Sequence, residues 1–196
     1  RSQFFIVGED LGTVEPWVRE ALGRFRILSY RLLYFERGEW GRFKRPHEYP
    51  QQALVSTTTH DLATLAGFWV GADIDARRSA GVLDDAGYHN AKASRDDDKN
   101  KLLEALREQR LLPDGDFWQW SDQVRDACLA YLAQSPAMLL AINHEDLSGE
   151  IYQQNLPGTT AQYPNWGRKM TKSPHEMAAA PATASTRDLL KRTGRA

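Results

Sequence analysis

The sequence has one cysteine, no long hydrophobic run and no excess of charge of either sign. Cys128 cannot form an internal disulfide, as is typical of proteins from a reducing compartment, so we expect a cytoplasmic protein. The longest purely apolar run, Ala137 to Ile142, is far shorter than the roughly 20 residues that cross a bilayer. The 25 basic and 26 acidic residues nearly cancel, and no basic block is present. We therefore expect neither a membrane nor a nucleic acid as a partner.

Patterns for cofactors and metals are also lacking. Gly8 and Gly12 flank an acidic pair that would repel phosphate, which argues against a nucleotide-binding loop. The run His144-Glu145-Asp146 does not have the ligand spacing of a zinc site. Cys128 has no basic neighbour to activate it and is expected to be a packed thiol. We expect no cofactor and no metal.

Short apolar runs at regular spacing predict strands of a parallel sheet. The first three begin about 25 residues apart, the spacing of strand-helix units, and a fourth follows a long helical excursion. Continuous apolar strands are expected where both faces of a parallel sheet are covered. The predicted strands are Phe4 to Val7, Ile27 to Phe35, Ala53 to Ser56 with an extension through Thr59, and Ala137 to Ile142.

In the intervals between these strands, helical periodicity and capping residues predict helices. The charged segment Arg95 to Lys101 is expected to be a solvated helix start. The predicted helices are Val14 to Gly23 capped by Thr13, Leu62 to Val70, Lys99 to Leu112, one opened by Ser121, and one opened by the capping box Ser173-Pro174-His175-Glu176.

Two carboxylates follow predicted strands. Glu9 comes after the first strand and Asp61 after the third, so both are expected at the carboxyl edge of the sheet, where strand ends two places apart lie roughly 10 Å from each other. Paired carboxyls of this kind can cleave a glycosidic bond. The alternative is that Glu9 and Asp61 cap the helices that follow them.

Four motifs, in this order and spacing, closely resemble the 4-α-glucanotransferases, also called amylomaltases or disproportionating enzymes. The resemblance covers Phe4 to about Met170, and it corresponds to the carboxyl-terminal part of a family member. The motifs are Gly8-Glu9-Asp10-Leu11-Gly12-Thr13-Val14, Leu28-Ser29-Tyr30-Arg31-Leu32-Leu33-Tyr34-Phe35-Glu36, Thr58-Thr59-His60-Asp61-Leu62, and Asn155-Leu156-Pro157-Gly158-Thr159 with Tyr163-Pro164-Asn165-Trp166.

The resemblance implies an α/β fold, namely a partial (β/α)8 TIM barrel. The chain would supply approximately strands five to eight, with a helical insertion before the last strand. A complete barrel takes about 250 residues, so 196 cannot hold one. We expect residues 1-170 to form the carboxyl-terminal half of the catalytic barrel and residues 171-196 a terminal helix and tail. The missing amino-terminal half of the barrel is then an expected partner.

The resemblance also implies roles for individual residues. Glu9 matches the family's general acid/base and Asp61 its transition-state-stabilising aspartate. His60 matches a histidine that hydrogen-bonds the sugar at the cleavage point, and Asn155 a position near the substrate groove. The aspartate nucleophile of the family lies on the fourth barrel strand and has no match here. Ala63 stands where the family usually has proline, and Gly167 where it has arginine.

The implied activity is transfer of α-1,4-glucan segments between maltooligosaccharides by a retaining double displacement. One alternative is an α-glucan hydrolase of the same barrel type, and another is an inactive fragment that at most binds carbohydrate. Most of the six tryptophans are expected in the core, and the loop residue Trp40 is the candidate for stacking on a sugar.

Overall fold

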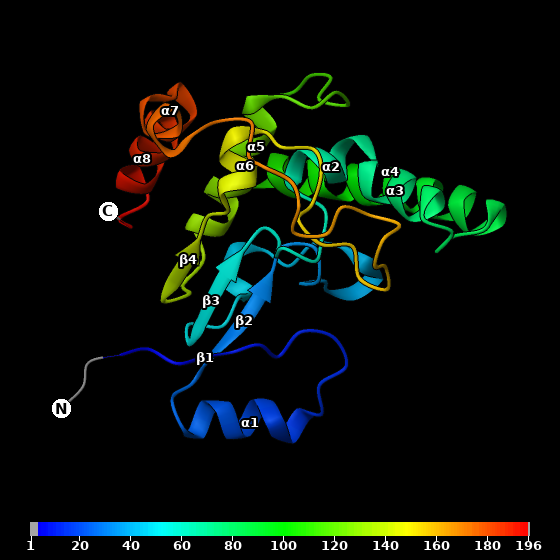
Figure 1. The fold of residues 1–196 in the computed structure, drawn as a ribbon. Helices are drawn as coiled ribbons and strands as arrows, with labels where there is room; N and C mark the ends of the chain where they lie inside the picture. Colours follow the sequence, from blue (N-terminus) through cyan, green and yellow to red (C-terminus); the bar gives the residue numbers. More distant parts are fainter. Residues whose placement is uncertain (1–3, 196) are drawn as a thin grey trace.

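The computed structural model describes residues 4–195, in which four parallel strands lie side by side in chain order. Figure 1 shows β2 and β3 at the centre of the sheet, with β1 and β4 as its two edges. In register, Val7 pairs with Leu28, Ser29 with Ala53, and Leu54 with Leu139. The strands are β1 (Val7–Gly8), β2 (Leu28–Leu32), β3 (Ala53–Ser56) and β4 (Leu139–Ala141).

Eight α-helices and two short 3-10 helices join or follow these strands within the described residues. Only α1 lies between β1 and β2, whereas three helices follow β3 before α5 leads into β4. The helices are α1 (Pro16–Arg24), α2 (Leu65–Val70), α3 (Ala72–Ser79), α4 (Asp85–Glu108), α5 (Asp122–Ala133), α6 (His144–Ser148), α7 (Pro174–Ala179) and α8 (Pro181–Arg192), with η1 (Glu39–Gly41) and η2 (Pro46–Glu48) after β2.

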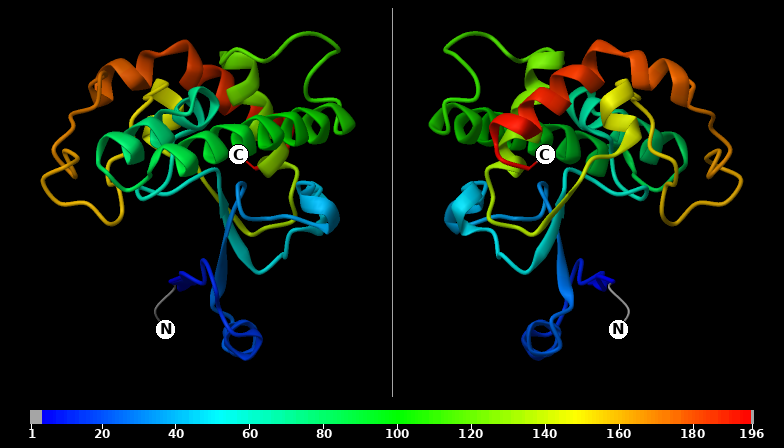
Figure 2. Two further views of the ribbon diagram at one scale, coloured as in Figure 1. Left: turned by 90° about the vertical axis from the view of Figure 1, so that its right-hand side faces the viewer. Right: turned by 90° about the vertical axis from the view of Figure 1, so that its left-hand side faces the viewer.

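The main core lies between the sheet and the helices α2, α4 and α5. Figures 1 and 2 show this helical layer above β3 and β4, while β1 and α1 project away from it. Its fully buried members include Val55 of β3, Leu65 of α2, Leu106 of α4 and Tyr131 of α5. A smaller cluster joins α5 to α8 through Leu129 and Leu189. The core therefore fixes the two central strands more firmly than β1.

Side-chain caps set several helix starts, as the sequence indicates. Ser121 accepts a hydrogen bond from Val124 N and opens α5, and the Ser173–Glu176 capping box opens α7. Thr64 caps α2 by accepting from Gly67 N at 2.9 Å. Because Thr64 is the cap, α2 starts three residues later than predicted, and Asp61 stays in the loop before it.

Other predicted boundaries are also wrong, among them the end of the second strand, since β2 stops at Leu32 and not at Phe35. Thr13 is not the cap of α1, which begins at Pro16 behind Glu15 with no side-chain cap. The first strand is confined to Val7–Gly8, because β1 pairs on one side only and residues 4–6 extend past the end of β2. The helix predicted over Lys99 to Leu112 is α4, which starts at Asp85 and ends at Glu108.

The charged segment Arg95 to Lys101 is not a solvated helix start. It lies inside α4, where Arg95 forms two hydrogen bonds of 2.9 and 2.8 Å with the Asp73 carboxylate. The Lys99 side chain is buried, donates to Trp118 O at 3.1 Å and lies over the Trp118 ring. Burial lowers the pKa of Lys99. These charges face α3 and the loop after α4, contacts that no helical periodicity reveals.

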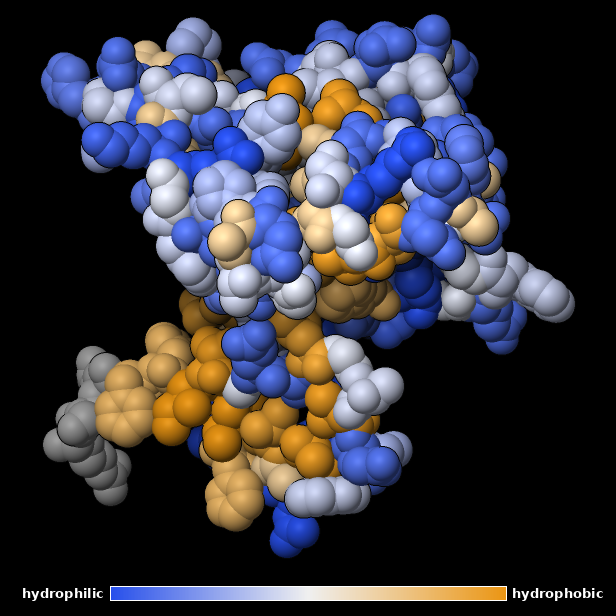
Figure 3. Space-filling view, turned by 45° about the vertical axis from the view of Figure 1, so that its right-hand side comes forward, coloured by the Kyte–Doolittle hydropathy of each residue, from blue (hydrophilic) through white to orange (hydrophobic). Residues whose placement is uncertain are grey.

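Apolar side chains are exposed around β1 and α1. Figure 3 shows the orange surface gathered over this projecting part of the molecule. Phe4, Phe5 and Ile6 are 69%, 66% and 51% exposed, and Trp17 and Phe25 on or beside α1 are 67% and 77% exposed. Apolar surfaces of this size are uncommon on monomeric proteins.

Candidate active site

A pocket of about 190 Å³ lies at the carboxyl ends of the strands. Every strand contributes to it: Glu9 follows β1, Tyr30 lies on β2, His60 follows β3, and Glu145 follows β4. The remaining lining residues are Thr58, Thr59, Leu62, Thr64, Asn143, Gln153 and Gln154. This is the edge at which parallel strand-helix folds gather their functional side chains.

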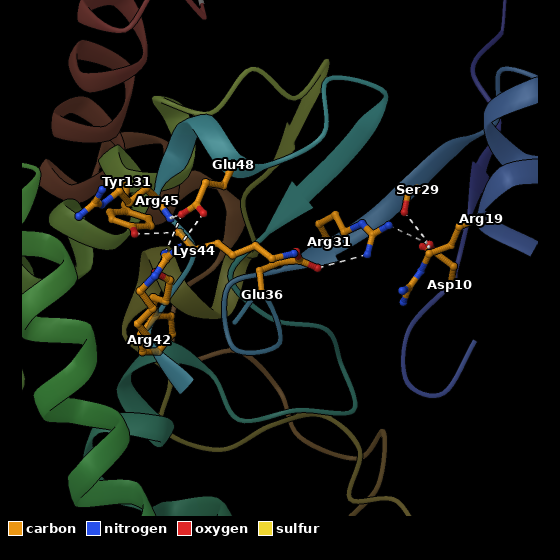
Figure 4. A network of polar contacts seen from close by, with 11 residues as sticks. Asp10, Arg19, Ser29, Arg31, Glu36, Arg42, Lys44, Arg45, Glu48 and Tyr131 are labelled. Atoms are coloured by element: carbon orange, nitrogen blue, oxygen red, sulfur yellow. Dashed lines mark hydrogen bonds and ion pairs between the residues drawn. The ribbon is translucent and has the colours of Figure 1, made fainter. Parts of the chain in front are cut away.

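Asp10 anchors the loop that carries Glu9. Its buried carboxylate accepts hydrogen bonds from Ser29 Oγ at 2.6 Å and from Tyr30 N at 2.8 Å, and it lies 3.4 Å from the Arg31 guanidinium (Figure 4). Burial raises the pKa of Asp10, but these hydrogen bonds and the Arg31 charge outweigh it, so the pKa lies below its ordinary value. The loop after β1 is thereby tied to β2, while the neighbouring Glu9 stays exposed at the pocket.

The Asp10 contacts belong to a longer polar network. Arg31 also pairs with Glu36, whose other oxygen receives Lys44 Nζ at 2.6 Å, as Figure 4 shows. Lys44 in turn offers its carbonyl to the Tyr131 hydroxyl on α5 at 2.8 Å. The network connects the Glu9 loop through β2 and the following loop to the helical core.

Tyr30 lies on β2, the strand between the two strands that precede Glu9 and Asp61. Burial raises the pKa of its hydroxyl and the Glu9 charge adds to that effect, whereas a hydrogen bond with Ser56 opposes it. The phenol therefore stays protonated and can donate a hydrogen bond at neutral pH. Tyr30 lines the pocket but was not predicted as a site residue. It lies within β2, whereas the sequence prediction considered residues that follow the end of a strand.

His60, Asp61 and Asn155 form one cluster. Asn155 Nδ2 donates to Asp61 Oδ1 at 2.7 Å, and His60 Nε2 lies 3.3 Å from the same oxygen. The Asn155 backbone N–H donates to His60 O at 3.0 Å. Gln153 Nε2 donates to the carbonyls of both Asp61 and Asn155, at 3.0 and 2.7 Å. The loop around residues 153–155 thus holds the loop after β3 by three hydrogen bonds, and the fourth bond braces the loop internally.

Asp61 does not line the same pocket as Glu9. It lines an adjoining hollow of about 260 Å³, which shares Leu62 and Gln153 with the pocket. His60 connects the two spaces, because it lines the pocket and contacts Asp61. The structure therefore brings Glu9 and His60 together, and Asp61 and Asn155 together, with His60 shared between the pairs.

The alternative role of these carboxylates as helix caps is wrong. The cap of α1 is Glu15 and that of α2 is Thr64, so neither Glu9 nor Asp61 occupies a capping position. Both side chains remain available in loops at the carboxyl ends of their strands.

Asp146 joins β3, α2 and α6 beneath the pocket. It is fully buried, accepts from Leu65 N at 2.7 Å, and accepts a very short hydrogen bond from the Thr57 hydroxyl. Burial raises its pKa to about 6, although the bonds from Leu65 and Thr57 oppose the shift. Asn143 Nδ2 donates to Thr58 O at 3.0 Å. The residues after β4 therefore hold the end of β3 in place.

No group of three or more metal-ligating side chains comes together within residues 4–195. His144, two positions before the buried Asp146, is exposed. Among the described helices, none combines the length and apolar character needed to span a membrane.

A protein-family model described as 4-alpha-glucanotransferase matches residues 1–174 of the sequence. The match covers well over half of the chain. The chain belongs to the 4-α-glucanotransferase family.

Relatives named 4-alpha-glucanotransferase come from several bacteria. One from Haemophilus influenzae is 34% identical over 177 residues, covering 88% of this chain and 25% of the relative. One from Mycobacterium bovis is 37% identical over 178 residues, covering 87% of this chain and 24% of the relative. The chain thus spans about a quarter of the length of these family members.

Solved amylomaltases share the architecture. The crystal structure of amylomaltase from Corynebacterium glutamicum matches with a TM-score of 0.85 and 28% identity, covering 96% of this chain and 29% of that one. An amylomaltase from Streptococcus agalactiae in complex with acarbose matches with a TM-score of 0.66 at 17% identity, covering 97% of this chain and 32% of that one, and shows the fold alone.

Ala63 and Gly167, the two positions expected to differ from the family motifs, lie near the site. Ala63 is buried beside Thr64, and it lines the hollow that also holds Asp61. Gly167 closes the turn after Trp166 by donating to Pro164 O at 3.0 Å.

Sequence reasoning also missed other polar residues of the pocket, among them Glu145, Asn143 and Gln153. Glu145 and Asn143 follow the end of β4 as Glu9 follows the end of β1, so the same reasoning could have found them. Gln153 lies two residues before Asn155 in a loop without periodicity, and only its contacts distinguish it.

Proposed function

We propose that this chain is the carboxyl-terminal half of a 4-α-glucanotransferase catalytic barrel, approximately its strands five to eight. The order β1-β2-β3-β4, with every pair parallel and each neighbour consecutive in the chain, is the order of strands in a (β/α)8 barrel. Residues 171-196, which contain α7 and α8, would lie outside the barrel as a terminal element packed on α5. We also propose a cytoplasmic location, in keeping with the single buried Cys128.

The proposed partner of the exposed apolar surface is the amino-terminal half of the same barrel. β1 and β4 each pair on one side only, so both outer edges are open to further strands. Phe4, Phe5 and Ile6 would become buried when those strands are added. The 196-residue chain alone is expected to self-associate, and a monodisperse monomer in sedimentation would count against this partner.

The activity we propose is transfer of α-1,4-glucan segments between maltooligosaccharides with retention at the anomeric carbon. The observation that carries it is the pocket shared by Glu9 and His60, with Asp61 and Asn155 attached through His60. Acarbose, which the Streptococcus agalactiae amylomaltase binds, is a ligand we expect for the intact protein as well.

The first half-reaction breaks the bond between two glucosyl units. An aspartate from the other half of the barrel attacks the anomeric carbon, and Glu9 donates its proton to the departing glycosidic oxygen. Asp61 stabilises the positive charge that develops on the sugar ring, and His60 donates a hydrogen bond to a sugar hydroxyl. Asn155 holds the Asp61 carboxylate through the 2.7 Å bond.

The second half-reaction transfers the bound segment. Glu9, now ionised, takes the proton from a hydroxyl of a second glucan, and that oxygen replaces the aspartate at the anomeric carbon. Glu9 is exposed at the pocket, where an incoming glucan can reach it. The protein returns to its starting protonation state, and no cofactor or metal takes part in the proposed cycle.

Product analysis tests this function. The chain extended upstream in the same reading frame, called the extended protein below, is incubated with maltotriose. Longer and shorter glucans formed together, with constant reducing ends, support transfer. Reducing ends that rise with consumed water indicate a hydrolase instead, and absence of both reactions contradicts the proposal.

A further inference from the structure

Trp166 is an exposed indole held in a strained backbone conformation. Its side chain is 64% exposed, and its φ of 58° lies in the left-handed region. A bulky residue in this region costs about 1–3 kcal/mol, and the strain persists only where the surrounding structure fixes it. Because this large apolar ring is exposed, no hydrophobic burial offsets the backbone strain.

The turn that carries Trp166 is fixed on both sides. The Tyr163 hydroxyl donates to Gln153 O at 2.7 Å, which ties the turn to the loop that holds Asp61. The Arg168 guanidinium lies 4.4 Å from the ring centre of Tyr152 and 5.1 Å from that of Tyr163. These contacts hold the indole outward and prevent the turn from relaxing the strain.

The Trp166 ring borders the pocket. Its centre lies 5.0 Å from that of the His60 ring, with 42° between the two planes. The backbone N–H of Trp166 donates to Gln154 O at 2.9 Å. His60 and Gln154 both line the pocket together with Glu9. The two rings therefore form a tilted aromatic wall at the edge of the space where a glucosyl unit would lie.

We propose that Trp166 is a stacking platform for a glucosyl ring of the bound α-glucan, next to the ring that contacts His60. The apolar C–H face of a glucose ring packs on an indole plane, and a rigid, exposed indole loses little entropy when it binds. This inference rests on the proposed function, since it assigns a sugar to the same pocket. Its ligand class is an α-1,4-linked glucan of at least two units.

Fluorine NMR of the extended protein tests the contact directly. The protein is labelled with 5-fluorotryptophan and titrated with maltotriose. Trp166→Phe and Trp17→Phe each remove one resonance and so assign it. Trp17 is the control, because it lies on α1 and does not line the pocket. The Trp166 resonance should shift and saturate with maltotriose, while the Trp17 resonance stays fixed.

Affinity gives the second readout. Trp166→Ala should raise the Kd for maltotriose about tenfold, or about 1.4 kcal/mol, whereas Trp166→Phe should stay within about threefold of the unaltered protein. Trp17→Ala should leave the Kd unchanged. If the extended protein transfers glucan from maltotriose while the Trp166 resonance stays fixed, or if Trp166→Ala binds maltotriose normally, this inference is overturned and the proposed function stands. If maltotriose shifts no resonance and no transfer occurs, the proposed function itself fails.

Discussion

Asn155 donates a hydrogen bond of 2.7 Å from its side-chain nitrogen to the Asp61 carboxylate, across 94 positions of the chain. The backbone reinforces this contact, because Asn155 N–H also donates to His60 O. A bond to a charged carboxylate contributes more than one between neutral groups. The loop after α6 therefore sets the direction in which Asp61 points.

Replacing Asn155 should impair activity without unfolding the protein. Asn155→Ala in the extended protein removes a hydrogen bond to a charged group, worth about 1.5–3 kcal/mol, so kcat for maltotriose should fall about 10- to 100-fold. The backbone bond to His60 O does not depend on the side chain and remains. Initial rates of glucose release measure the effect, and Asn90→Ala, an exposed asparagine on α4, is the control. Equal rates for Asn155→Ala and the unaltered protein would show that Asp61 needs no such partner.

Asp146 should make the protein less stable as the pH rises. Its folded-state pKa of about 6 exceeds the ordinary value, so the folded state holds more protons than the unfolded state between about pH 4 and that pKa. Stability is therefore lost as the pH increases through this interval. Asp146→Asn keeps an acceptor for Leu65 N and carries no charge. The stability of this variant relative to the unaltered extended protein should grow by up to about 3 kcal/mol from pH 4 to pH 7.

Urea unfolding at a series of pH values measures this difference. Asp146→Ala removes the acceptor as well as the charge and should be less stable at every pH. A difference between Asp146→Asn and the unaltered protein that does not change with pH would contradict the raised pKa.

Asp10 should show the opposite pH dependence. The folded-state pKa of Asp10 is lowered. Its contribution to the free energy of unfolding is therefore fully present above about pH 4 and is lost as the pH falls through the folded-state pKa. Asp10→Asn loses the ion pairs with Arg31 and Arg19 and should cost about 1–3 kcal/mol at pH 7. The same unfolding series should show this cost shrinking below about pH 4. If the destabilisation by Asp10→Asn instead increases as the pH falls, the lowered pKa of Asp10 is contradicted.

Gly67 cannot accept a side chain. A Cβ built there would lie 2.1 Å from Ile151 O, a backbone atom of the loop that leads to Gln153. Gly67→Ala must push this loop away from α2, and we expect a loss of about 2–4 kcal/mol, the size of a severe core defect. Gly23→Ala on α1 is the control, because nothing lies within 4 Å of its Cβ. Urea midpoints should fall for Gly67→Ala and stay level or rise for Gly23→Ala; two equal midpoints would contradict the close approach.

The sheet could be predicted from the sequence because its central strands are buried on both faces. Ala53–Ser56 matches the predicted third strand, and Leu139–Ala141 lies inside the predicted fourth. The start of α4 could not be predicted, since its first half contacts α3 through charged side chains such as Arg95, and not through an apolar stripe. The short β1 reflects an open sheet edge, a property of the tertiary structure.

The site could be predicted in part from two signals: functional residues follow the ends of parallel strands, and the family motifs mark individual residues. They place Glu9, His60, Asp61 and Asn155 in loops at one edge of the sheet, where the structure has them. They do not indicate that Asp61 turns into the adjoining hollow, or that Gln153 holds it there. Those features depend on contacts between loops about 90 residues apart, and no local pattern encodes them.

The role of Glu9 as acid/base is the central claim, and its test compares two substrates for Glu9→Gln in the extended protein. With maltotriose, whose leaving oxygen needs a proton, the rate should fall about 10²- to 10⁴-fold. With a nitrophenyl maltoside, whose phenolate leaves without one, the first-turnover burst of nitrophenol should be nearly retained, while later turnovers slow because Glu9 is also the base of the second half-reaction. Glu15→Gln, at the exposed N-cap of α1, should match the unaltered protein with both substrates. Equal loss with both substrates, or maltotriose transfer at the unaltered rate, would contradict the account.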